Sequence, residues 1–322
     1  MMPLRITLPA ILAGLLAACG NLAPADRPAH SFQSAHAFGA TAVAFSPDGR
    51  KLASAGYRGD LRLWQVDPPR SLGALPSQHD AVRAVAFASD VWLVTGGDDG
   101  DLIVWDLDKR TPVSRQHTSP VAAIAARGGS LITGHRDGSL RQWSLPALEA
   151  LRTADAGAPI IAVARHDNTI ALATTSGRVA LFGSDLTWQR DLQVDGTVAH
   201  DLRFSPDGEQ IFAGSWFRLL VWSVADGQLR RIASDHGGLI NSVDVSPDGR
   251  RIASLGRNTD SAVRIWNRER LSVERRFQAH DLCGAMIRFS PDGRYLASAS
   301  DDESIRLYDL GDRPRHSSAR LP

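Results

Sequence analysis

The sequence predicts an all-β protein, a seven-bladed β-propeller built from four-stranded antiparallel blades. Three observations predict it: an aromatic residue closes a short strand seven times, a polar landmark precedes it at a steady distance, and turn-forming residues separate the strands. Self-similarity at a period of about forty residues is typical of propellers, in which each repeat supplies one blade. A chain of 322 residues is long for an ordinary domain, but a closed propeller uses this length as one unit.

The first landmark is the aromatic residue that ends a strand of mostly alternating apolar and polar positions. Successive aromatics lie 41, 38, 39, 40, 44 and 42 residues apart. They are Trp64, Trp105, Trp143, Phe182, Trp222, Trp266 and Tyr308. Alternation of apolar and polar positions in several of these segments marks strands with one buried face.

The second landmark is a histidine or aspartate that precedes each aromatic by 26 to 30 residues. The seven are His36, His79, His117, Asp155, Asp195, His236 and His280. This pattern resembles the WD-repeat family, whose repeats begin near Gly-His and end near Trp-Asp. Trp105-Asp106 is the only literal Trp-Asp, and no repeat has glycine before its histidine. The resemblance, which covers residues 29 to about 310, therefore rests on spacing.

Turn residues follow the first strand of each repeat. Ser-Pro-Asp-Gly occurs at 46–49, 205–208, 246–249 and 290–293. Proline fixes φ at the second turn position, and glycine supplies the positive φ that closes a hairpin. Blades 2 to 4 carry shorter turn formers in the same place: Ala88-Ser89-Asp90, Gly128-Gly129 and Asp167-Asn168.

Closure of the ring requires the two ends of the chain to meet. No strand pattern follows Tyr308, so the outer strand of blade 7 is missing from the end of the sequence. Residues 30–33 stand before His36 as residues 276–278 stand before His280. We therefore expect the N-terminal strand to complete blade 7, the propeller to cover 29–310, and 311–322 to form a flexible tail.

The first residues have the plan of a secretory signal peptide: a positive start to Arg5, an apolar run from Ile6 to Ala18, then Cys19. A transmembrane helix is the alternative, but the run is shorter than the roughly 20 residues that cross a bilayer. Leu16-Ala17-Ala18-Cys19 resembles the lipobox of bacterial lipoproteins. That resemblance implies removal of residues 1–18, acylation of Cys19, and a linker over 19–28.

The localisation expected from this resemblance is the bacterial envelope. Aspartate after the lipidated cysteine commonly means inner-membrane retention, and this chain has Gly20 there. The sequence thus favours the outer membrane, facing the periplasm, over the inner membrane. With Cys19 lipidated, Cys283 has no partner for an intrachain disulfide and is expected to be a small buried core residue.

Charge and motifs exclude several classes of function. Lys+Arg number 36 against 35 Asp+Glu, and loss of Arg5 with the signal peptide leaves 35 of each. A neutral protein offers no general attraction to nucleic acid. The sequence has no phosphate-binding glycine loop, Cys-x-x-Cys pair, His-Glu-x-x-His motif or nucleophile elbow, so we expect neither a cofactor nor a metal.

Histidines, hydroxyls and acids recur together and could be mistaken for catalytic triads. A hydrolase needs one such site, in a cleft with an oxyanion hole, so four copies at repeat spacing predict scaffold and no enzyme. The resemblance implies that they form a buried hydrogen-bond network within each blade. The sets are His79, Thr95, Asp99 and Trp105 in blade 2; His117, Thr133, Asp137 and Trp143 in blade 3; His236, Ser254, Asp260 and Trp266 in blade 6; and His280, Ser298, Asp302 and Tyr308 in blade 7.

Blades 1, 4 and 5 break this set. Arg58 stands where blade 1 should have the turn aspartate, Asp155 and Asp195 replace the histidine in blades 4 and 5, and Trp216-Phe217 fills the turn of blade 5. Such departures predict a surface kept for binding. The alternative is drift of repeats that remain stable through their neighbours.

Trp216 and Phe217 are the sharpest binding candidates, because the turn should lie on the face where WD-repeat proteins usually meet partners. Interface hot spots are enriched in Trp, Tyr and Arg. In the alternative, both rings fold against the adjoining blade. The corresponding turns also carry Arg58, Arg136, Arg178, Arg218 and Arg257, whereas those of blades 2 and 7 are acidic, which suits a partner of mixed charge or simply marks solvated turns.

The sequence as a whole predicts a non-catalytic, lipid-anchored scaffold that binds other envelope proteins and whose propeller is monomeric. A small-ligand-binding or enzymatic propeller that uses its central channel is the alternative. The innermost strands begin with the apolar residues Ala40, Val82, Val121 and Ile160, which argues against a channel site.

Overall fold

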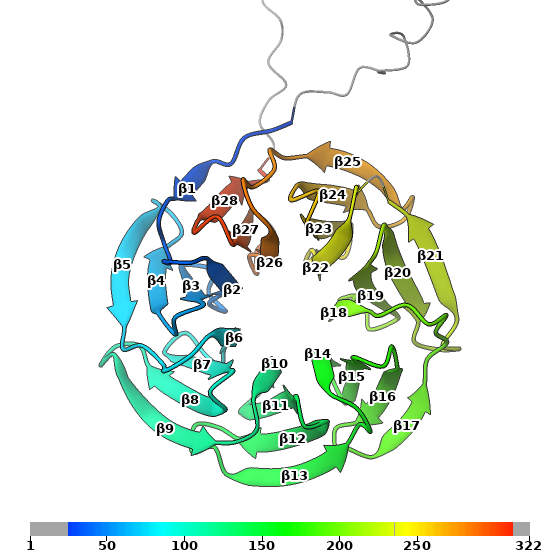
Figure 1. Ribbon diagram of the computed structural model, residues 1–322, viewed down its shortest axis with the longest axis horizontal. Coiled ribbons are helices and arrows are strands. Elements are labelled where there is room, and N and C mark those ends of the chain that lie inside the picture. The colour runs from blue at the N-terminus through cyan, green and yellow to red at the C-terminus, as the bar shows by residue number, and fades with distance from the viewer. Residues whose placement is uncertain (1–24, 235, 312–322) are drawn as a thin grey trace, which may run out of the picture.

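The computed structural model describes residues 25–234 and 236–311, which form a ring of seven four-stranded antiparallel sheets (Figure 1). None of the described residues is helical, and none forms a helix able to cross a membrane. The predicted fold class, a seven-bladed propeller, is confirmed. The signal peptide, Cys19 and residues 312–322 of the predicted tail lie outside the described residues.

Each blade runs from an inner strand at the channel to an outer strand at the rim. Blades 1 to 3 consist of β2 (Ala40–Phe45), β3 (Lys51–Gly56), β4 (Leu61–Gln65) and β5 (Arg70–Leu75); β6 (Val82–Phe87), β7 (Trp92–Gly97), β8 (Asp101–Asp106) and β9 (Thr111–His117); and β10 (Val121–Arg127), β11 (Ser130–His135), β12 (Ser139–Ser144) and β13 (Ala150–Asp155).

The remaining blades follow the same order. Blades 4 to 7 consist of β14 (Ile160–His166), β15 (Thr169–Thr174), β16 (Val179–Gly183) and β17 (Trp188–Asp191); β18 (His200–Phe204), β19 (Gln210–Ser215), β20 (Arg218–Ser223) and β21 (Leu229–Ala233); β22 (Leu239–Val245), β23 (Arg251–Arg257), β24 (Val263–Asn267) and β25 (Ser272–Arg276); and β26 (Gly284–Phe289), β27 (Tyr295–Ser300), β28 (Ile305–Asp309) and β1 (His30–Phe32).

The aromatic landmarks end the third strand of each blade and pack between blades. Trp64 pairs with Leu52 on the second strand, and Tyr308 pairs with Leu296. All seven landmark aromatics are at most 4% exposed. Their period therefore follows from one buried aromatic per blade, which joins the hydrophobic clusters between neighbouring sheets.

The Ser-Pro-Asp-Gly segments form the expected hairpin turns. In the first, the Ser46 hydroxyl donates to Asp48 over 2.6 Å, and the amide of Gly49, at φ +71°, donates to the Ser46 carbonyl. The Ser246 and Asp248 side chains make the same 2.6 Å contact in blade 6. The turn fixes the register of inner and second strands and so positions the residues that line the channel.

The ring closes through its N-terminal strand, as predicted. β1 pairs antiparallel with β28, and the Phe32 ring lies 4.3 Å from the Trp64 ring of blade 1 (Figure 1). Within the described part of the chain, the first contact with the ring is made by Asp26, which bridges Phe277 beside β25 and whose amide donates to the Arg276 carbonyl over 2.9 Å. The N-terminal segment therefore joins blades 6, 7 and 1.

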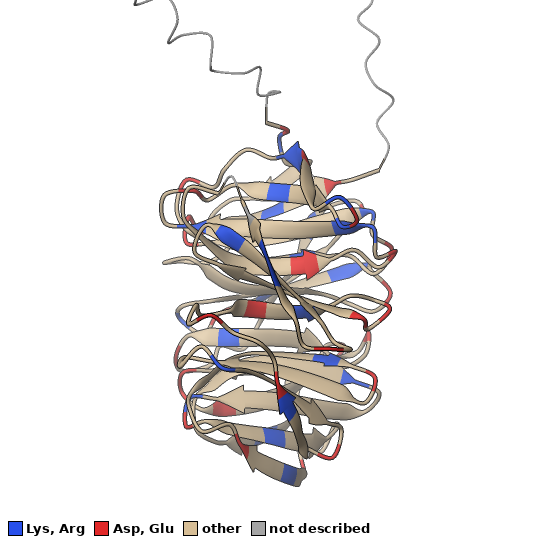
Figure 2. Ribbon diagram, turned by 90° about the vertical axis from the view of Figure 1, so that its right-hand side faces the viewer, with Lys and Arg blue, Asp and Glu red and all other residues tan. Residues whose placement is uncertain are grey.

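The propeller has two faces. We define the upper face as the surface that carries the turns between the second and third strands of each blade. Because strand direction alternates within a blade, the links from each outer strand to the next inner strand lie on the same face. Figure 2, a view from the side, shows Lys and Arg interspersed with Asp and Glu. This mixture agrees with the balanced composition.

Candidate functional site

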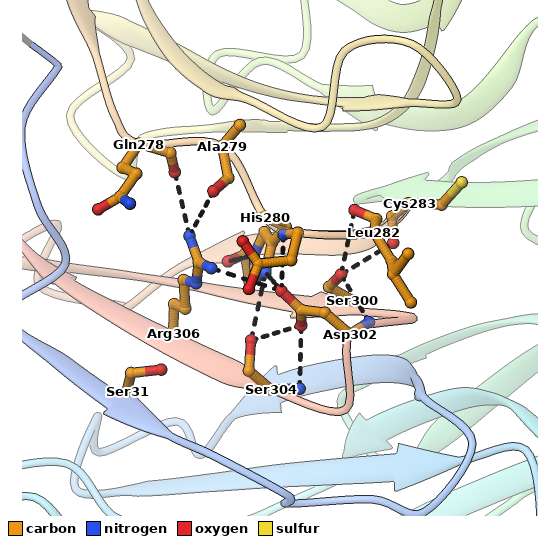
Figure 3. A network of polar contacts seen from close by, with 12 residues as sticks. Ser31, Gln278, Ala279, His280, Leu282, Cys283, Ser300, Asp302, Ser304 and Arg306 are labelled. Atoms are coloured by element: carbon orange, nitrogen blue, oxygen red, sulfur yellow. Dashed lines mark hydrogen bonds and ion pairs between the residues drawn. The ribbon is translucent and has the colours of Figure 1, made fainter.

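Buried hydrogen bonds surround His280 in blade 7, where Figure 3 shows it with Asp302, Ser304 and Arg306. His280 Nδ1 lies 2.9 Å from Asp302, and His280 Nε2 lies 2.7 Å from the Ser298 hydroxyl. The Tyr308 hydroxyl is 3.2 Å from Ser298 Oγ. The His280 side chain is fully buried and that of Asp302 is 6% exposed, so neither can meet a substrate.

The protonation of this network follows from burial. Burial lowers the pKa of His280, and the hydrogen bond to Asp302 offsets this only in part. Burial alone would raise the pKa of Asp302, but the hydrogen bonds from His280 and Ser304 outweigh it and lower that pKa. A neutral His280 donates from Nδ1 to Asp302 and accepts the Ser298 proton at Nε2, which satisfies both ring nitrogens.

Blade 6 repeats the arrangement, and so does blade 1. In blade 6, His236 lies 2.8 Å from Ser254 and 3.1 Å from Asp260, and the Trp266 indole donates to Ser254 over 2.8 Å. In blade 1 the corresponding residues are His36, Ser54, Trp64 and Asp60, and Asp60 accepts from His36. Blade 1 is therefore complete: the acid comes from Asp60, next to β4, and Arg58 does not replace it.

Blade 3 differs from the expectation, because its buried histidine comes from another strand. His135, at the end of β11, is fully buried, and its Nε2 lies 2.7 Å from Thr133. The Trp143 indole donates to Thr133, and His135 Nδ1 donates to the Ser119 carbonyl. His117 is 77% exposed and contacts Asp101 instead.

The register of the strands explains this exchange. Val121 pairs with His135 where Ala40 pairs with Gly56 and Ile240 with Gly256. A Cβ on either glycine would lie 2.8 Å from the Nδ1 atom of the blade's buried histidine. In blade 3 the side chain at this position is itself the histidine. Asp137 consequently stays outside the network, half-exposed, and bonds to Ser139 and Arg141.

Blade 2 keeps half of the predicted set. The Trp105 indole donates to Thr95 over 2.9 Å. His79 is exposed, and its neighbour Gln78, 6% exposed, donates to the Asp101 carbonyl in its place. The Asp99 carboxylate accepts from the amides of His79 and Asp101.

Blades 4 and 5 lack a buried histidine on these positions. Thr174 contacts Ser176 in blade 4, and the Trp222 indole donates to the Gln193 carbonyl in blade 5. Asp155 and Asp195 cap the loops that follow them. These polar clusters tie strands together, and their hydroxyls are buried, as for Thr133, Ser254 and Ser298, which are all 0% exposed.

The predicted aromatic pair stands out from the upper face. Trp216 and Phe217 are 51% and 53% exposed, and their ring centroids lie 5.9 Å apart. The Phe217 amide donates to the Gly238 carbonyl over 3.0 Å, and Trp216 bridges Leu239. The backbone is thus fixed to blade 6 while both rings point into solvent. Arg218 beside them is exposed and lies more than 4 Å from the acids of the described residues.

A second aromatic lies on the same face. Phe38, in the link from β1 to β2, is 61% exposed, and the Arg58 guanidinium stands 3.9 Å above its ring. Phe38 and Phe217 both have positive φ, +70° and +58°, which is uncommon for bulky residues and costs on the order of 1–3 kcal/mol.

The other predicted arginines are engaged in ion pairs. Arg136 pairs with Asp98 over 2.8 Å, Arg178 with Asp191 over 2.7 Å, and Arg257 with Asp301 over 3.1 Å. Cys283 is only partly buried and lies at the upper face before β26, so it is not the core residue that its apolar surroundings suggested.

The central channel is a cavity of about 930 Å³ lined by the inner strands. On one side, Arg203 of β18 pairs with Asp201 and Asp244, and Arg288 of β26 pairs with Asp201 over 2.9 Å. Burial would raise the pKa of Asp201, but the charges of Arg203 and Arg288 lower it. Burial does raise the pKa of Asp244. The apolar starts of the first four inner strands are as expected, but they did not reveal these charges in blades 5 to 7.

Within the described residues, no three His, Cys, Asp or Glu side chains come together in a way that could hold a metal ion. The described residues present two aromatic sites on the upper face and a charged, partly apolar channel.

Comparison with known proteins agrees with the fold. A family model described as "WD domain, G-beta repeat" matches residues 27–65, 70–106, 227–267 and 272–309. These segments hold the inner strands of blades 1, 2, 6 and 7. The segment between them, 107–226, contains the inner strands of blades 3 to 5, where the buried histidine network is altered or missing.

Several curated proteins are similar over most of the chain. They include cilia- and flagella-associated protein 52 of Sus scrofa (24% identical, 82% of this chain, 37% of the relative), periodic tryptophan protein 2 of Arabidopsis thaliana (25%, 78%, 24%) and the 66 kDa stress protein of Physarum polycephalum (23%, 83%, 46%). The chain thus spans less than half the length of these relatives. With its repeats, its closed ring and these matches, the chain belongs to the WD-repeat β-propeller family.

Proposed function

We propose that this protein is a non-catalytic scaffold that binds another envelope protein through its upper face, with Trp216, Phe217 and Arg218 at the centre of the contact. WD-repeat propellers are generally non-catalytic and bind protein partners. The observation that carries the proposal is the pair of half-exposed aromatic rings on a backbone hydrogen-bonded to the neighbouring blade. A preorganised aromatic pair loses little conformational entropy on binding, which makes it a favourable anchor.

The strained backbone at Phe217 supports this choice. Glycine would adopt a φ of +58° without cost, yet an aromatic residue stands there with 53% of its surface exposed. The phenyl ring of Phe217 does not become fully buried in return for this strained backbone. A contact with a partner outside the propeller would account for the strain. Phe38 with Arg58 forms a second aromatic and cationic pair on the same face.

The proposal includes a lipid anchor at Cys19 in a bacterial envelope. It rests on the lipobox-like sequence before Cys19 and on the place where the chain meets the ring. Asp26, which contacts blade 6, follows Cys19 by seven residues, which span at most about 25 Å when extended. An acylated Cys19 would keep the rim at blades 6 and 7 close to the bilayer.

The Trp216→Ala/Phe217→Ala double variant is expected to lose its protein partner. Membranes are solubilised gently, each tagged protein is pulled down, and co-purified proteins are compared by mass spectrometry. We expect a stoichiometric partner with the wild type and at least a tenfold loss with the variant, because truncation of buried aromatic anchors costs 2 kcal/mol or more.

Trp188→Ala is the matched control, since Trp188 is 57% exposed but lies on the outer strand β17. This variant should retain the partner, and all three proteins should melt at the same temperature. Retention of the partner by the double variant would disprove the upper-face contact, and absence of a partner from every protein would contradict the scaffold.

Cys19→Ser tests the anchor. The wild type is expected in the membrane fraction and in the detergent phase of a Triton X-114 separation, because acyl chains drive membrane binding at about 0.8 kcal/mol per buried methylene. The variant should move to the aqueous phase. An unchanged distribution would contradict lipidation at Cys19.

A further inference from the structure

The wall of the central channel differs sharply from one side to the other. The seven inner strands share one equivalent position. The residue at this position pairs with a residue of the second strand, which in turn pairs with the residue just before the landmark aromatic on the third strand. In blades 1 to 4 this position is alanine, and in blades 5 to 7 it is charged. The seven residues are Ala44, Ala86, Ala125, Ala164, Arg203, Asp244 and Arg288.

The charged side is linked across three blades. Asp201 accepts from the Ser242 hydroxyl over 2.7 Å and from Arg288 over 2.9 Å, so β18, β22 and β26 meet at one carboxylate. Asp201 reaches this point from a backbone φ of +50°. The carboxylates of Asp201 and Asp244 therefore already have hydrogen-bond donors, which are arginine side chains or backbone amides.

Arg165 differs from the other arginines of the channel, because it forms no ion pair with an acid of the described residues. It lies near the lower end of β14, lines the same cavity, and donates from Nε to the Asp167 carbonyl over 3.2 Å. Its Nη1 is buried and has no hydrogen-bond partner among the described residues. The carboxylate of Asp167 is engaged by Arg127 over 2.8 Å. Burial, and then the charge of Arg127, lower the pKa of Arg165.

The channel as a whole carries excess positive charge. Its described lining includes five arginines (Arg83, Arg136, Arg165, Arg203 and Arg288) and two aspartates, Asp201 and Asp244. Asp98, outside the lining, pairs with both Arg83 and Arg136, so Arg165 is the one arginine of the described lining without an ion pair. A positive group that is partly shielded from water attracts anions more strongly than the same group on an open surface.

We propose that the channel binds a small organic anion, with its carboxylate or phosphate at Arg165 and its apolar part against the alanine wall. The cavity of about 930 Å³ is within the usual range for small-molecule sites, which are mostly apolar with a few placed polar groups. This site is separate from the upper-face contact, so either can fail without the other.

Isothermal titration calorimetry with matched probes tests the proposal on the full chain. Phenyl phosphate carries both parts of the ligand, benzoate carries the ring with a carboxylate, inorganic phosphate carries the anion alone, and phenol carries the ring alone. We expect one phenyl phosphate or benzoate per chain, bound at least tenfold more tightly than inorganic phosphate or phenol. Whichever of the two anions binds more tightly identifies the class of head group.

Two variants locate the site. Arg165→Gln should weaken binding of the better probe at least tenfold, whereas Arg230→Gln, an equal loss of charge on the outer strand β21, should leave it unchanged. Ala125→Leu narrows the apolar wall without touching a charge and should also weaken binding, which provides a second test if Arg165→Gln melts early. The proposal is overturned if neither organic anion binds, if inorganic phosphate binds equally well, or if binding survives both channel variants.

Discussion

Deletion of residues 29–34 is expected to destabilise the entire ring, with a fall of roughly 10 °C in the melting temperature and loss of a single cooperative transition. The deletion removes β1, so β28 loses its outer partner. It also removes Phe32, which is 9% exposed and stacks on Trp64 of blade 1. Loss of a buried phenylalanine alone costs about 3–5 kcal/mol.

The effect should spread because the N-terminal segment joins three blades. Differential scanning calorimetry of the deletion is compared with Phe32→Ala, which keeps the backbone pairing, and with Val113→Ala, which trims a 46% exposed side chain on β9. Phe32→Ala should show an intermediate loss and Val113→Ala none. Cooperative melting of the deletion at the wild-type temperature would show that closure through β1 does not stabilise the ring.

His135→Ala is expected to lower the free energy of unfolding by about 1–3 kcal/mol, and His117→Ala to change it by less than about 0.5 kcal/mol. His135 is fully buried, and its removal takes the acceptor from the Thr133 hydroxyl proton and one of the donors from the Ser119 carbonyl. The side chain of His117 is 77% exposed. Spacing along the sequence would give the opposite order.

Urea denaturation monitored by tryptophan fluorescence measures both variants, and His280→Ala serves as a positive control because its side chain is fully buried. Equal destabilisation by His117→Ala and His135→Ala would contradict the arrangement of blade 3. A small effect of all three would mean that the buried networks add little to stability.

The repeats predicted the fold because each blade buries one aromatic residue and contains one tight hairpin. The aromatic and the turn residues therefore recur in the sequence at a nearly fixed spacing. The side-chain networks were harder to predict, because a hydrogen bond can be made from more than one backbone position. Asp60 reaches His36 from a site two residues nearer the aromatic than Asp302 in blade 7, and His135 enters from a different strand altogether.

The charged side of the channel could have been predicted from the sequence by comparing equivalent positions near the ends of the inner strands instead of the residues that begin them. Arg203, Asp244 and Arg288 each stand two residues before a Ser-Pro-Asp-Gly turn, and Ala44 occupies this place in blade 1. Which of these charges are paired could not be predicted, because Asp201 joins them only through its positive φ in the distorted start of β18.

The closing strand also sets the order in which the protein can be completed during synthesis. β1 is among the first segments made, but its partner β28 is the last strand of the described residues. At about 5–20 residues per second, translation from Phe32 to Ile305 takes roughly 15–55 s. During that interval β1 has no partner strand. Ring closure therefore cannot precede the synthesis of β28, and a chain that terminates before β28 leaves β1 unpaired.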